Sequence, residues 1–118
     1  MIKPKIKLNP LEKTAVNVPT PESYVQLMRV FESGDWKWRG GNKPTAYGNY
    51  GFYSEDFCIG MGIDEDDKDE IGHAPEYYWL KQNVKVISSE KFYEQQKDVT
   101  PEKLKEINAY FDWKEKQT

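Results

Sequence analysis

Residues 64–70 form an acidic run, which is the first candidate in this chain for a chemical role. An EF-hand calcium loop needs oxygen ligands at positions 1, 3 and 5, Gly at position 6 and Glu at position 12. Counted from Asp64, position 5 is Lys68 and position 12 is Pro75. The EF-hand pattern therefore fails, and we interpret the run as a solvated acidic loop.

His73 and Cys58 are the single histidine and the single cysteine. His73 could act as a base or a ligand, but no nucleophile motif surrounds it. No two carboxylates stand out as an acid–base pair. Cys58 lies in an apolar segment, which is typical of a thiol acting as a small core residue. The segment 40–43, Gly-Gly-Asn-Lys, lacks the glycine spacing of a P-loop. We therefore predict no enzyme, no metal site and no cofactor.

Aromatic and cationic side chains interleave in the segment 36–43. Stacked rings flanked by Lys and Arg are typical of single-stranded nucleic-acid binding. The candidate residues for such binding are Trp36, Lys37, Trp38, Arg39 and Lys43. In a strand, however, the two tryptophans point to the face opposite Lys37 and Arg39. We therefore favour the interpretation that both indole rings lie in the core, and nucleic-acid binding is the alternative.

A second aromatic group lies among the glycines of residues 43–56. Its members are Tyr47, Tyr50, Phe52 and Tyr53. Such a stretch is difficult to bury completely, and exposed aromatic side chains are enriched at protein interfaces. We expect this loop, with the neighbouring acidic segment, to be the contact surface for a partner protein. A small ligand or nucleotide that uses these rings as a pocket wall is a third possibility.

The composition fits one small domain with an aromatic core. The chain has 118 residues, with four Trp, eight Tyr and five Phe, and 31% of its residues are charged. The net charge of −3 argues against a uniformly basic nucleic-acid binder. Basic residues gather in the first 13 positions and acidic ones in residues 54–76. Segregated charge of this kind favours oriented contacts with a partner.

The N-terminus is basic but lacks the apolar region and small-residue cleavage site of a signal peptide. No run of about 18 apolar residues is present to span a membrane. We expect the protein to act in a cytoplasm, without membrane contact.

Helix signals occur at three places. Thr20 and Pro21 begin a helix that Gly34 ends, and its apolar stripe falls on Tyr24, Leu27, Met28 and Phe31. Ser88 or Ser89 begins a short helix through residue 96, and Thr100-Pro101-Glu102 begins the last helix. Strands are expected at 15–18, 36–39 and 57–63, with a hairpin over 77–87.

These elements predict an α+β fold. We expect a small, mostly antiparallel sheet of three to five strands, with the N-terminal helix packed on it and a C-terminal helix pair. Residues 1–14 would form an extended basic arm, and residues 15–118 would form a single domain.

The residue pattern resembles small accessory proteins of tailed phages and prophages. The resemblance covers about residues 16–93 and rests on four motifs: Tyr24-x-x-Leu27-Met28-x-x-Phe31, Gly34-Asp35-Trp36-x-Trp38-x-x-Gly41, Cys58-Ile59 and Val86-Ile87-Ser88-x-x-x-Phe92. It implies a phage-encoded protein that binds and redirects or blocks a host factor in the bacterial cytoplasm, and it assigns no functional residue. The leading prediction is a non-enzymatic protein-interaction module. The alternative is a single-stranded nucleic-acid binding protein.

Overall fold

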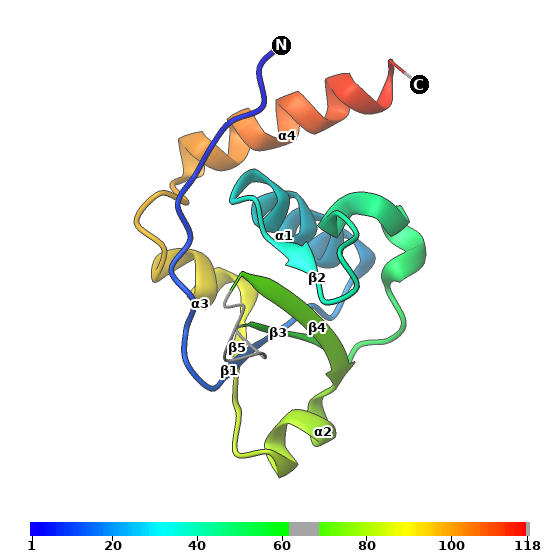
Figure 1. Ribbon diagram of the computed structural model, residues 1–118, viewed down its shortest axis with the longest axis vertical. Helices are drawn as coiled ribbons and strands as arrows, with labels where there is room; N and C mark the ends of the chain where they lie inside the picture. The colour runs from blue at the N-terminus through cyan, green and yellow to red at the C-terminus, as the bar shows by residue number, and fades with distance from the viewer. Residues whose placement is uncertain (62–68, 118) are drawn as a thin grey trace.

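Five strands form one mixed sheet in the order β2-β4-β3-β1-β5 (Figure 1). The structure is a computed structural model that describes residues 1–61 and 69–117, apart from the side chain of Tyr50. The strands are β1 (Thr14–Asn17), β2 (Lys37–Trp38), β3 (Phe57–Met61), β4 (Glu70–Pro75) and β5 (Lys85–Ser88). The central strand β3 runs antiparallel to β1 and β4, whereas β5 is parallel to β1 and β2 is parallel to β4.

The predicted α+β class and the range of three to five strands are confirmed. The sheet is more mixed than expected, because its two outer ladders are parallel. Both parallel ladders join strands that are far apart in the sequence, and local turn signals cannot predict such pairings.

The helices are α1 (Pro21–Ser33), α2 (Glu76–Lys81), α3 (Ser89–Glu94) and α4 (Pro101–Glu115), and a 3-10 segment, η1, covers Pro44–Gly51. At the start of α1, the Ser23 N–H donates to the Thr20 hydroxyl at 3.0 Å, and the Thr20 N–H donates back to the Ser23 hydroxyl at 3.1 Å. This reciprocal capping box satisfies two backbone donors. The three predicted helix starts are confirmed.

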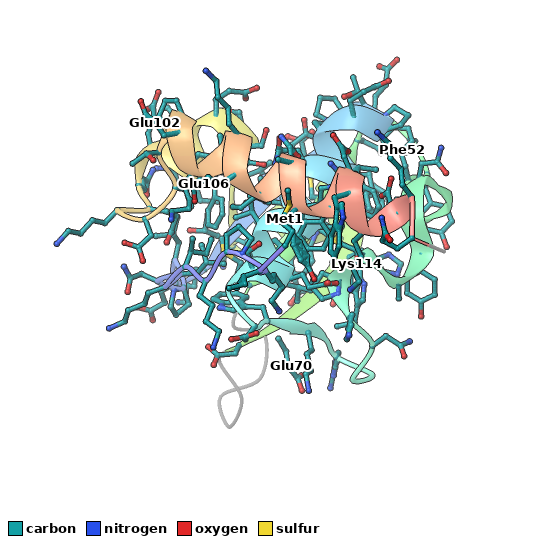
Figure 2. All side chains as sticks on the ribbon, turned by 90° about the horizontal axis from the view of Figure 1, so that it is seen from above. Met1, Phe52, Glu70, Glu102, Glu106 and Lys114 are labelled. Atoms are coloured by element: carbon teal, nitrogen blue, oxygen red, sulfur yellow. The ribbon has the colours of Figure 1, made fainter. Side chains whose placement is uncertain are left out.

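The main core lies between the sheet and helices α1, α3 and α4. In Figure 1, α1 and α4 lie on the same side of the sheet, and Figure 2 shows α4 crossing this side with Glu102 and Lys114 towards its opposite ends. Phe31 is central to the packing, since its ring stacks on Trp36 at 5.2 Å and contacts Phe92 at 5.6 Å between ring centroids.

The opposite face of the sheet is covered by α2, where Trp79 packs with Ala15 and Cys58. A Cβ atom at Gly60 would lie 2.4 Å from Trp79 Cη2, so the indole needs glycine at this position. The predicted hairpin over 77–87 is therefore wrong in its first half, which is the helix α2. The helix buries Trp79 and leaves its neighbours exposed.

The N-terminal arm packs onto the domain. Residues 1–13 contain no helix or strand, but Ile6 and Leu8 are buried in the main core. The Ile6 N–H donates to the Ser33 carbonyl at 3.1 Å, and the Gln96 side-chain amide donates to the Asn9 carbonyl at 2.9 Å. Apolar residues at alternate positions give the arm one buried face.

Two predictions fall partly on residues 62–68, which lie outside the described residues. They are the end of the strand predicted over 57–63 and most of the acidic run at 64–70. In the described ranges, no helix is both long and apolar enough to cross a membrane.

Candidate functional site

An open stretch of sheet edge lies beside β4. The strand β2 pairs Lys37 with Glu70 and Trp38 with Ile71, and no other strand of residues 1–61 and 69–117 pairs with residues 72–75 on that side. The chain leaves the sheet at a tight turn, in which the Gly41 N–H donates to the Trp38 carbonyl at 2.7 Å. The φ of Gly41 is +92°, a conformation that glycine adopts without strain.

A groove of about 680 Å³ follows this edge. We call it the aromatic groove, and its lining includes Tyr24, Trp38, Arg39, Tyr47, Gly51, Tyr53, Ile71, His73, Tyr78 and Trp79. One wall comes from η1 and the residues after it, and the other comes from α2. The groove is therefore built by segments that are distant in the sequence.

His73 lies at the centre of the aromatic contacts in the groove. Its ring stacks on Tyr53 with centroids 5.7 Å apart and an interplanar angle of 26°. The edge of the Trp38 ring meets it at 5.7 Å and 86°. Aromatic pairs at these separations add to the stabilisation from burial. These contacts hold the Tyr53 wall against β4.

The rim of the groove exposes aromatic surface. Tyr53 is 72% exposed, Tyr47 is 48% exposed and Tyr78 is 46% exposed. The Asn42 side-chain amide donates to the Tyr47 hydroxyl at 2.6 Å, which fixes one of these rings. Large rigid rings that border a concave surface are typical of binding sites.

The electrostatics of the groove favour an anionic group. Arg39 is the permanently charged side chain in the described lining, which contains no carboxylate. The protein as a whole has a net charge of −3. The described lining of the groove therefore carries a positive charge, although the protein as a whole is negatively charged.

Tyr24 lies in the lining with an unpartnered hydroxyl. The residue is 1% exposed, and its hydroxyl has no hydrogen-bond partner among the described residues. Burial, with smaller contributions from Tyr53 and Tyr47, raises the pKa of Tyr24 to about 12. The phenol therefore remains a neutral donor at physiological pH. A buried donor without a partner lowers stability, and such groups are rare in native structures.

The predicted contact residues divide into several groups. Tyr47 and Tyr53 border the groove, whereas Phe52 is partly buried against the core and packs near Phe57 at 6.4 Å. The side chain of Tyr50 lies outside the described part. In Figure 2, Phe52 lies at the edge of the molecule beside η1.

The segment 36–43 is also divided. Trp36 is 2% exposed and Trp38 is 8% exposed, so their rings lie in the core, as the period of a strand predicts. Lys37, Arg39 and Lys43 are exposed, but only Arg39 lines the groove.

Sequence reasoning missed the contribution of β4 and α2 to the site. The sequence suggests a base or a ligand as the role of His73, and it predicts a hairpin that contains Tyr78 and Trp79. The usable signal in the sequence for β4 was Pro75, which ends the strand.

Cys58 is a buried core thiol on the α2 side of the sheet. Burial raises its pKa to about 11, although a hydrogen bond from the Asn17 amide at 3.7 Å works in the opposite direction. A thiol with a raised pKa is a weak nucleophile, which agrees with its interpretation as a small apolar residue.

Comparisons with models of protein families, with curated proteins and with solved structures found no significant match to this chain.

Proposed function

We propose that the protein is a non-enzymatic protein-interaction module and that the aromatic groove is its contact surface. The observation that carries the proposal is the exposed ring set of Tyr47, Tyr53 and Tyr78 around a concave edge of the sheet. Tyrosine supplies a large contact area at a low cost in conformational entropy. A partner side chain that enters the groove would displace water from several rings at once.

A protein partner fits this geometry better than single-stranded nucleic acid does. The nucleic-acid alternative relied on Trp36 and Trp38 as a stacking platform, and both rings are almost fully buried. Rings in the core have no free face for a base. Among the described residues of the lining, Arg39 is the one permanently charged cation, whereas strand binding needs a charged path along the backbone.

The phage resemblance supplies the context of the proposal. We propose a phage accessory protein that acts in the bacterial cytoplasm and binds a host protein, whose activity it modulates. The exposed tyrosines support a macromolecular partner, and the resemblance supports its bacterial origin.

The proposal is tested by affinity capture from bacterial lysate with and without nuclease. Wild-type protein is compared with the double variant Tyr53→Ala, Tyr78→Ala, and Tyr77→Ala is the matched control. Tyr77 is 63% exposed on the same helix as Tyr78 but does not line the groove. Binding of the captured protein is then measured with purified components.

We expect a nuclease-resistant protein that the control variant retains and the double variant loses. Retention by all three proteins would place the contact surface elsewhere. Capture that disappears with nuclease would favour the nucleic-acid alternative.

A further inference from the structure

We propose that the partner contributes an extended segment that pairs with the open edge of β4 as an additional strand and directs an acidic side chain to Arg39. This inference rests on the proposed function and specifies the chemistry of the partner. It uses the backbone of β4, the two walls of the groove and the charge of its lining.

The backbone of His73 is free to pair. On one side of β4, Gly72 and Ala74 are opposite Gly60 and Cys58 of β3. On the other side, the Arg39 N–H donates to the Ile71 carbonyl at 3.1 Å. Main-chain groups alternate in direction along a strand, so the N–H and C=O of His73 point away from β3, as those of Ile71 do.

Neither group of His73 has a hydrogen-bond partner in the described part of the chain. An unpaired strand edge is a template for another chain, and addition of a peptide strand is a common recognition mode. The turn after Trp38 leaves this position vacant, because it takes the chain out of the sheet after two paired residues. An added segment would continue in line with β2.

The two walls of the groove fit the alternating side chains of an added strand. Ile71 is buried in the main core, and the exposed ring of His73 stacks on Tyr53. Ala74 packs on the opposite face with Trp79. Successive side chains of a strand point to opposite faces. One partner residue would therefore contact Tyr53 and the next would contact the α2 wall.

The polar groups of the lining indicate an acidic side chain. Arg39 lies in the lining without a carboxylate beside it in the described part of the groove. The hydroxyl of Tyr24 in the same lining is buried, so Arg39 is the donor that an incoming side chain would reach. A carboxylate accepts from a guanidinium group through charge-assisted hydrogen bonds, which are stronger than neutral ones.

The backbone part of the inference is tested by comparing His73→Pro with His73→Ala. Both variants lose the imidazole ring, but only the proline variant loses the outward N–H donor. The probe is a displayed library of random twelve-residue peptides, selected on the wild-type protein. The strongest binder is synthesised and titrated against both variants and against Arg39→Gln.

We expect His73→Pro to bind the peptide about tenfold more weakly than His73→Ala, given the loss of one hydrogen bond and an unpaired partner carbonyl. Arg39→Gln should weaken binding by about tenfold if a carboxylate is bound. The selected peptides should share an acidic residue in an extended, proline-free core.

Amide hydrogen exchange of the wild-type protein provides a measurement that does not depend on the folding of a variant. The His73 amide should exchange rapidly in the free protein and slowly with the peptide. The Gly72 amide is the internal control, because it faces β3 and should be protected in both states.

Equal binding by His73→Pro and His73→Ala together with unchanged His73 exchange would overturn strand addition. Selected peptides without acidic residues would overturn the carboxylate assignment. A library without any groove-dependent binder would also count against the inference, because strand addition needs only a short segment. In each case, groove-dependent capture of a folded protein from lysate would leave the proposed function standing.

Discussion

The close contact between Gly51 and Tyr24 makes Gly51→Ala a sharp test of the groove. A Cβ atom at position 51 would lie 2.1 Å from Tyr24 Oη and 2.6 Å from its Cζ. Gly51 does not have a positive φ, so the backbone accepts alanine without strain. The whole effect of the substitution is therefore steric.

The ring of Tyr24 has little room to move away. It is 1% exposed and meets Phe57 edge-on at 5.6 Å. Overpacking of this kind costs about 2 kcal/mol. For a domain of this length, we expect a fall of about 8 °C in melting temperature.

Thermal and urea unfolding followed by circular dichroism will measure the change, with Gly40→Ala as the control. A Cβ atom at Gly40 meets nothing within 4 Å, and Gly40 also lines the groove. The control should change the free energy of unfolding by less than about 0.5 kcal/mol. Tyr24→Phe in the Gly51→Ala background should recover part of the loss, because it removes the atom at 2.1 Å. Equal stability of Gly51→Ala and the control would refute the packing argument.

Three further predictions concern the arm, a helix contact and pH. In chemical unfolding, Ile6→Ala should lower the free energy of unfolding by about 2 kcal/mol. The change at exposed Lys5, Lys5→Ala, should lower it by less than about 0.5 kcal/mol. Equal values would show that the arm does not pack on the domain. Arg29 pairs with two exposed carboxylates of α4. Arg29→Met should therefore lower the free energy of unfolding by only about 1 kcal/mol. A decrease of more than about 4 kcal/mol would contradict this reasoning. The pKa of Cys58 rises from 9.0 to about 11 and that of Tyr24 from 10.0 to about 12. Because each pKa is higher in the folded state than in the unfolded state, the stabilisation is complete below the unfolded pKa and is lost as pH rises through the folded pKa. The free energy of unfolding should therefore fall by about 3 kcal/mol per group as pH rises from about 9 to 12. In urea unfolding across this pH range, the free energy of unfolding should fall less for Cys58→Ala than for the wild-type protein.

The sequence by itself predicted the elements whose signals are local. The start of α1 at Thr20 and Pro21 depends on hydrogen bonds within one turn, and the start of α4 repeats the same residues. The α1 stripe from Tyr24 to Phe31 predicted the face that packs on the sheet. The burial of Trp36 and Trp38 also follows from the two-residue period of a strand.

Only the tertiary structure could determine the helix α2 and the groove. Residues 77–80 are apolar enough for a strand, but Trp79 packs over Gly60, and that contact joins segments that are distant in sequence. His73 becomes part of a site because β2 stops pairing after two residues and exposes the edge of β4. Strand order and the length of a pairing depend on contacts between remote segments, and no local pattern of residues encodes them.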